Sequence, residues 1–184
     1  VTFGLAQSRP HPKAYASMLE GISDSAKQGA QVFAQSTTRG IGVLFGFVNR
    51  TPFDRAPTWR ALRHLSLEQK LTKLRNSEYQ TQMVREANED PPPINFGDLF
   101  VLPKGEVRYD LGQSDSLQAH AERLGQTPAA AFITLALQDD GKTLFNYPFL
   151  NPQFEAVQEM LDHPRVVIGL GDSGAHCGQI MDSS

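Results

Sequence analysis

The chain has 184 residues, of which 40% are hydrophobic and 20% are charged, and its formal net charge is -3. This composition is typical of one globular domain, and scattered basic residues with net acidity argue against a nucleic-acid partner. The single cysteine, Cys177, excludes an internal disulfide framework and favours a reducing, cytoplasmic setting. No apolar run approaches the roughly 20 residues that span a bilayer, and no signal-peptide pattern is present, so we expect no membrane partner.

The first part of the chain predicts a loop, a helix and a strand, in that order. Residues 1–12 contain turn formers and two prolines and are expected to form a loop. From Lys13 to Gly29 the apolar residues follow helical spacing, and the glycine is a natural stop. Residues 30–36 are a strand candidate, and residues 37–42 form a loop at its carboxyl end. Helix, glycine and strand together indicate the αβ half of a βαβ unit.

Residues 51–90 change character and predict a helical insertion. Thr58 is expected to cap a short helix, and Ser66 opens a second helix with a capping box. Asn76 or Ser77 opens a third. Three consecutive prolines end the segment. Because the segment is short and polar, we expect it to be an insertion and not a domain with its own core.

The last part of the chain predicts helices followed by a strand. Thr127 with its following proline is an N-cap, and Asn151 with its following proline gives the same start signal. The second of these helices is expected to end near His163. The strand Arg165–Gly171 follows, and its apolar run Val166–Ile168 indicates burial. The expected apolar stripe of that helix is Phe154, Val157, Met160 and Leu161.

The loop after this strand carries an acid, a hydroxyl and an imidazole within five positions, namely Asp172, Ser173 and His176. Its glycines match the pattern of a dinucleotide-binding loop. Only ten residues follow Gly174, however, which is too few for the second strand and the acid that such a site needs. We therefore interpret the pattern as accidental.

Three interpretations of this loop remain open. With Ser173 as nucleophile the loop approximates a nucleophile elbow, and the chain would be a serine hydrolase, although that architecture places its acid and histidine after the serine. Alternatively, Asp172 at a strand end can ligate a metal or accept a proton from water. Finally, the Asp-Ser-Gly sequence can be a turn, and the chain would then be a non-catalytic helical interaction module.

Most of the chain resembles the amidohydrolase superfamily, in its D-aminoacylase (N-acyl-D-amino-acid deacylase) branch. The sharpest similarity is the run 163–176 within residues 129–184. Residues 30–46, which contain Gln35 and Arg39, are similar to the segment around the seventh barrel strand, and Thr51–Trp59 to the helical part after it. The resemblance implies an α/β fold. The whole chain, 1–184, would be a partial (β/α)8 TIM-barrel fragment, helix-rich, with a helical insertion at about 51–90.

The resemblance also implies a function. The parent protein would be a metal-dependent hydrolase of C–N amide bonds in N-acyl amino acids or similar small molecules. Zinc or another divalent metal would activate water, and Asp172, which matches the acid on the eighth strand, would transfer its proton to the leaving nitrogen. Asp172 can also be a metal ligand. His176 would line the substrate pocket or be structural, and Arg39 would bind a substrate carboxylate or be a solvated loop residue.

The chain departs from this family in its metal ligands. It has five histidines, none of them paired as His-x-His, and it lacks the family's bridging ligand. Only two stretches are convincing barrel strands, whereas a complete barrel has eight. We therefore expect the chain to be a fragment that is inactive by itself, because most of the metal ligands lie outside it. The exact substrate and the oligomeric state are not determined by the sequence.

Overall fold

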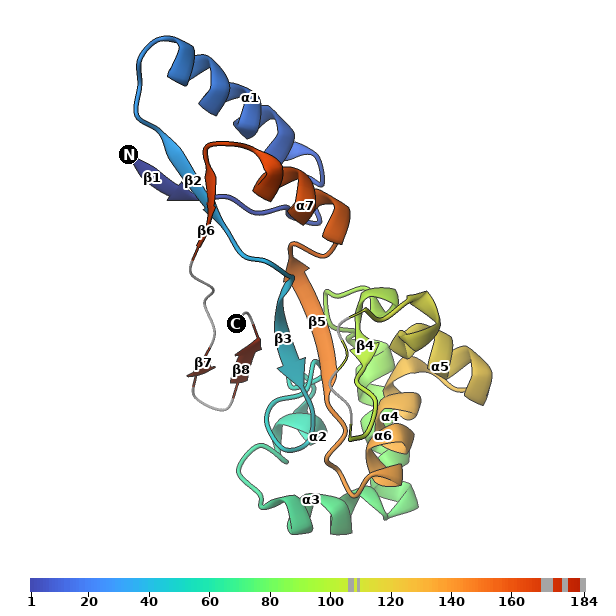
Figure 1. The fold of residues 1–184 in the computed structure, drawn as a ribbon. Coiled ribbons are helices and arrows are strands. Elements are labelled where there is room, and N and C mark those ends of the chain that lie inside the picture. The colour runs from blue at the N-terminus through green and yellow to red at the C-terminus, as the bar shows by residue number, and fades with distance from the viewer. Residues whose placement is uncertain (106–107, 109, 170–173, 177–178, 183–184) are drawn as a thin grey trace. The chain divides into compact units, whose positions relative to one another are not determined.

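The computed structural model describes residues 1–105, 108, 110–169, 174–176 and 179–182 (Figure 1). The expected α/β class is confirmed, because the chain contains both α-helices and β-sheets. The chain forms two compact units. The first unit comprises Val1–Val43 and the described parts of Pro148–His176 and Ile180–Ser184. The second unit comprises the described part of Leu44–Tyr147, together with Gln179.

The first unit contains a parallel three-stranded sheet in the order β1-β2-β6. Phe3 pairs with Ala34, and Ala34 pairs in turn with Val166. The expectation of a loop over residues 1–12 is wrong, because β1 lies within it. β1 forms by pairing with a strand some thirty residues away, which a local pattern of polar residues and prolines does not reveal. The three strands are β1 (Thr2–Gly4), β2 (Phe33–Ser36) and β6 (Val166–Ile168).

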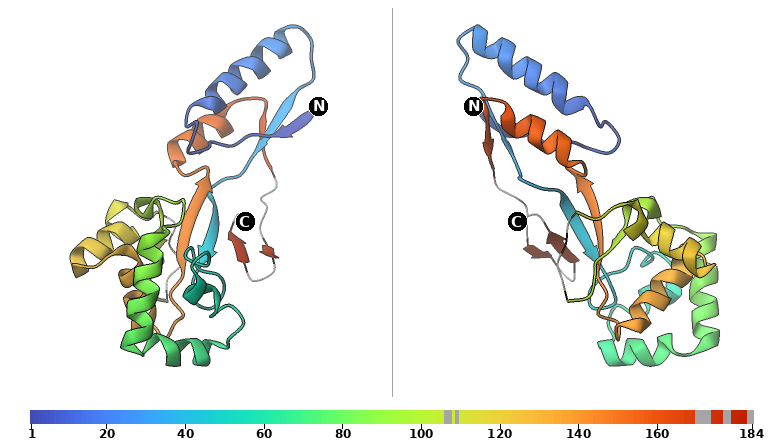
Figure 2. Two further views of the ribbon diagram at one scale, coloured as in Figure 1. Left: turned by 180° about the vertical axis from the view of Figure 1, so that it is seen from behind. Right: turned by 45° about the vertical axis from the view of Figure 1, so that its right-hand side comes forward.

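Two helices, α1 (Ala14–Lys27) and α7 (Phe154–Asp162), pack on this sheet and on each other (Figures 1 and 2). The predicted order of helix, glycine and strand is confirmed, since Gly29 ends the turn after α1 with a φ of +88°. The helices and strands bury a common hydrophobic cluster, called here the first core. Its buried members are Leu5, Tyr15, Leu19, Ile22, Ala34, Ala156, Val157, Met160 and Val166.

Two expectations about the last helix and strand are wrong. α7 does not begin at Asn151, which has a left-handed φ of +51°; its N-cap is Gln153, and Phe154 is half exposed. Within β6 only Val166 is buried, whereas Val167 and Ile168 are 46% and 72% exposed. β6 ends the order β1-β2-β6, so it is paired in that sheet on one side only, and its apolar run is not enclosed.

The second unit is mainly helical and has a separate hydrophobic cluster, called here the second core. Trp59, Phe53 and Phe132 meet at its centre, with ring centroids 4.5–5.9 Å apart. The predicted caps Ser66 and Thr127 are confirmed by hydrogen bonds to backbone N–H groups, and of the two candidates Asn76 and Ser77 it is Asn76 that caps its helix. The helices are α2 (Pro57–Arg60), α3 (Leu67–Leu74), α4 (Ser77–Glu89), α5 (Leu117–Leu124) and α6 (Pro128–Gln138), with short 3-10 turns at Phe96–Asp98 and Gln113–Asp115.

Thr58 does not cap α2 as expected, because the N-cap position is taken by Ala56. Thr58 instead binds α4: its N–H and hydroxyl donate to the two carboxylate oxygens of Glu86 at 2.8 and 2.6 Å. Desolvation raises the pKa of Glu86, but these two hydrogen bonds, with a further one from Gln82 and the charge of Arg85, hold it below its ordinary value. The polar α4 is thereby fastened to α2.

The remaining strands form a second, five-stranded sheet in the order β4-β5-β3-β8-β7. β4 and β5 are antiparallel, with Phe100 opposite Asn146. The described strands thus form two open sheets and no closed barrel, so the barrel remains a proposal. None of the helices in the described ranges is long and apolar enough to cross a membrane. The strands are β3 (Ile41–Phe45), β4 (Phe100–Val101), β5 (Phe145–Leu150), β7 (Gly174–His176) and β8 (Gln179–Asp182).

Candidate functional site at the carboxyl edge of the parallel sheet

The carboxyl ends of β1, β2 and β6 lie at one edge of the first unit's sheet, because the three strands are parallel. In α/β folds this edge is where ligands and catalytic groups gather. The loop after β6 begins directly beside β2: Gly169 N donates to Ser36 O at 2.8 Å. A Cβ at Gly169 would overlap that of Gln35, so the close approach requires glycine.

The structure describes the four candidate residues to different extents. Asp172 lies in 170–173, outside the described residues, as does Ser173. His176 lies in β7, and its side chain is outside the described part of the chain. Arg39 is half-buried in the loop that follows β2. Their assembly into one site therefore stays a prediction.

A buried polar network that the sequence did not predict joins the loops at this edge, and its centre is Asn151. The main chains of Asn151 and Gln7 meet through Asn151 N and Gln7 O at 2.8 Å. The side chain of Asn151 repeats the contact, because its Oδ1 accepts from Gln7 N at 2.7 Å. The Gln7 side chain continues the network: its Nε2 donates to Gln153 Oε1 and to Pro12 O.

The same asparagine reaches the loop after β2. Asn151 Nδ2 donates to Thr37 Oγ1 at 2.9 Å, and Thr37 Oγ1 donates in turn to the carbonyl of Arg39 at 2.7 Å. Asn151 and Gln7 are each 2% exposed, and Thr37 is 7% exposed. The loops after β1 and β2 are thus fixed to each other by buried hydrogen bonds, which are costly to leave unmade. One sequence signal could have placed Asn151 in a turn: asparagine adopts a positive φ more readily than most residues, and the φ of Asn151 is +51°.

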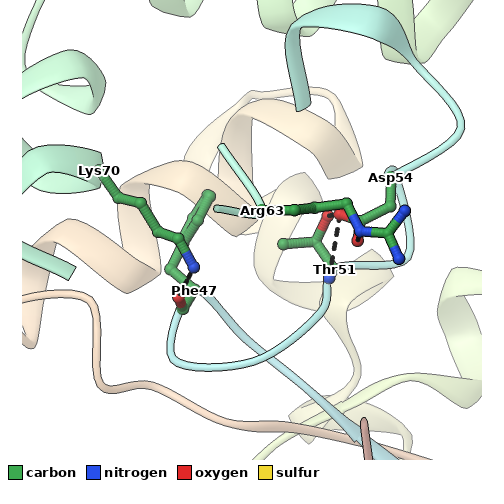
Figure 3. Close-up of polar contacts among 5 residues, drawn as sticks. All are labelled: Phe47, Thr51, Asp54, Arg63 and Lys70. Carbon is green, nitrogen blue, oxygen red and sulfur yellow. Dashed lines mark hydrogen bonds and ion pairs between the residues drawn. The ribbon is translucent and has the colours of Figure 1, made fainter. Parts of the chain in front are cut away.

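A second buried polar cluster lies in the second unit, around Lys70 of α3 (Figure 3). Lys70 is only 6% exposed, and its Nζ donates to Phe47 O at 2.6 Å. Burial lowers the pKa of the Lys70 ammonium below its ordinary value, and the carboxylate of Asp54 acts in the opposite direction. The sequence analysis did not single out this lysine, although it lies three residues after Leu67 and four before Leu74 and so shares the apolar face of α3.

Asp54 organises the other half of this cluster (Figure 3). Its Oδ1 accepts from both the hydroxyl and the N–H of Thr51, at 2.6 and 3.2 Å. Its Oδ2 lies 3.4 Å from Arg63 Nε in an ion pair. These contacts fix the turn between β3 and α2, so we interpret the Lys70 cluster as structural and place the candidate site at the carboxyl edge of the first unit.

The described histidines do not form a metal site. His163 ends α7, where its Nε2 lies 2.9 Å from Ser23 Oγ and its Nδ1 accepts from Arg165 N. His120 lies on α5, and burial lowers the pKa of its imidazole. Among the residues that the structure describes, no three His, Cys, Asp or Glu side chains lie close enough together to hold a metal ion. The described residues alone therefore do not fit a complete metal centre.

Searches of protein-family models, of curated proteins and of solved structures found no match to this chain. The comparisons therefore provide no information on family or function.

Proposed function

We propose that the chain is part of a metal-dependent amidohydrolase that hydrolyses C–N bonds other than peptide bonds, in N-acyl amino acids or related small molecules. The observation that carries this proposal is the parallel β1-β2-β6 sheet with α1 and α7 packed on it. Such a βα arrangement is the repeating unit of the barrel that the resemblance implies. In that barrel, the loops after β2 and β6 would both border the active site.

Asp172 is the proposed general base. It follows β6, whose successor Gly169 is fastened to the end of β2. A carboxylate at such a strand end can accept a proton from the attacking water and deliver it to the departing nitrogen, which is a poor leaving group unless it is protonated. Arg39 is the proposed group that binds the substrate carboxylate, through the paired N–H groups of its guanidinium.

A divalent metal, with zinc as our expectation, would supply Lewis-acid activation of that water in the complete protein. The described residues provide no group of three ligands, so we derive no step through the metal. We propose that the other ligands come from outside this chain and that the chain by itself is inactive.

The proposal is tested by Asp172→Asn in the complete protein, assayed for release of amino acid from N-acetyl amino acids. We expect turnover to fall by about 10²- to 10⁴-fold, the range typical of a lost general base, with most of the bound metal retained. Asp162→Asn, an exposed acid at the end of α7, is the matched control and should keep normal turnover. Normal turnover of Asp172→Asn would remove Asp172 from the mechanism. Labelling of Ser173 by a fluorophosphonate would favour a serine hydrolase instead.

A further inference from the structure

The hydrogen bonds around Thr37 have a fixed direction. The Thr37 hydroxyl has a single proton, which it donates to Arg39 O at 2.7 Å. The same oxygen must therefore act as acceptor toward residue 151, and it accepts from Asn151 Nδ2 at 2.9 Å. A side chain at position 151 that accepts but cannot donate would compete with Arg39 O for this single proton.

The backbone around Arg39 is held from a second side. A Cβ on Gly40 would lie 3.2 Å from Asn151 O and 3.5 Å from the Cβ of Pro148, so this part of the loop packs closely against residues 148–151. Asn151 is itself held by two hydrogen bonds to Gln7. The segment from Thr37 to Gly40 therefore rests on a rigid support.

We propose that Asn151 and Thr37 are positioning residues that set the main chain at Arg39, so that its guanidinium receives the carboxylate of an N-acyl amino acid. The inference rests on the proposed function, in which Arg39 binds that carboxylate. A bidentate contact between an arginine and a carboxylate depends on the angle as well as the distance of the guanidinium, so fixing the backbone that carries it raises affinity.

The identity of residue 151 matters chemically in this arrangement. A carboxylate at position 151 would still accept from Gln7 N, but it could not donate to Thr37. The Thr37 hydroxyl would then donate to the carboxylate, and the carbonyl of Arg39 would lose its partner. Asn151→Asp therefore keeps the size of the side chain and reverses one hydrogen bond.

The experiment is an NMR titration of the 184-residue chain with N-acetylalanine, followed at the Arg39 side-chain Nε resonance and at shifted backbone amides. We expect Arg39→Ala to weaken binding about tenfold or more, as loss of a charge-assisted contact does. Thr37→Val and Asn151→Asp should each weaken binding by about three- to tenfold. Thr37→Ser retains the hydroxyl and should bind as the unaltered chain does.

A double-mutant cycle separates positioning from general stability. If Thr37 acts through Arg39, adding Thr37→Val to Arg39→Ala weakens binding by less than about twofold more. Equal losses with and without Arg39 would overturn the inference and leave the proposed function standing. Absence of an effect of Arg39→Ala, or of any binding, would overturn the inference together with the place of Arg39 in the proposed function. The backbone spectra of the variants show whether each remains folded, and Asn151→Asp takes the place of Thr37→Val in the cycle if Thr37→Val does not fold.

Discussion

At the scale of single residues, buried polar side chains fix how the loops of this protein are arranged. Asn151 and Lys70 are both at least nine-tenths buried, and each binds backbone carbonyls or amides far away in the chain. Burial of such groups is costly unless their hydrogen bonds are made. Each of them therefore specifies one arrangement of the loops that it contacts.

Lys70 should make the stability of the chain depend on pH in the alkaline range. Because burial lowers the pKa of Lys70 below 10.5, the unfolded chain binds a proton that the folded chain does not bind at pH values between the lowered pKa and 10.5. Stability contributed by this group therefore rises with pH through that window. We expect the unfolding free energy of the unaltered chain, minus that of Lys70→Met, to increase from about pH 8 to about pH 11.

The measurement is denaturant unfolding of both proteins across this pH range, since other titrating groups cancel in the difference. Lys73→Met, which removes an exposed lysine from the same helix, shows the effect of losing one surface charge. A difference that falls as the pH rises would contradict the buried, destabilised ammonium.

At the scale of secondary-structure elements, side-chain caps predicted where helices begin, whereas the beginning of α7, which has no such cap, was misplaced. Ser66 and Thr127 were predicted as caps, and both accept a backbone N–H in the structure. α7 has no side-chain cap, and its N-cap was placed at Asn151, two residues before the observed N-cap Gln153. The Asn151 side chain instead accepts from Gln7 N and donates to Thr37 Oγ1. The preference of asparagine for a cap position therefore did not decide where α7 begins.

The capping box of α3 gives a prediction at this scale. Ser66 Oγ accepts from Gln69 N at 3.3 Å, and Gln69 Oε1 accepts from Ser66 N at 2.9 Å. Ser66→Ala should lower the free energy of unfolding by about 1 kcal/mol, measured by denaturant titration. Ser77→Ala, an exposed serine just inside α4, is the matched control and should change it by no more than about 0.5 kcal/mol. Equal effects of the two substitutions would show that the box contributes nothing.

At the scale of the whole molecule, the two hydrophobic cores share no residue. Met160 belongs to the first core, and Trp59, the single tryptophan, belongs to the second. Fluorescence of Trp59 therefore reports on unfolding of the second unit, whereas hydrogen exchange of the Ala34 amide in β2 reports on the first. Because each core is packed from its own elements, we expect the two probes to respond separately to a core substitution.

Met160→Ala tests this separation. Met160 is fully buried, so its truncation should destabilise the first unit by about 2–5 kcal/mol. The Ala34 amide should exchange correspondingly faster, with a much smaller shift of the Trp59 fluorescence transition. Equal shifts of both probes would mean that the chain unfolds as one cooperative body.

The sequence by itself determined the α/β class, the helices α1, α3, α4 and α6, and the strands β2 and β6, because caps, helical spacing and apolar runs act over a few residues. Tertiary structure decided β1, the role of Asn151 and the hydrogen-bond partner of Lys70. Their partners lie far away in the sequence: Gln7 and Asn151 are 144 positions apart, and Thr37 and Asn151 are 114 apart. Such contacts depend on how strands and loops meet in space, and no local pattern encodes that.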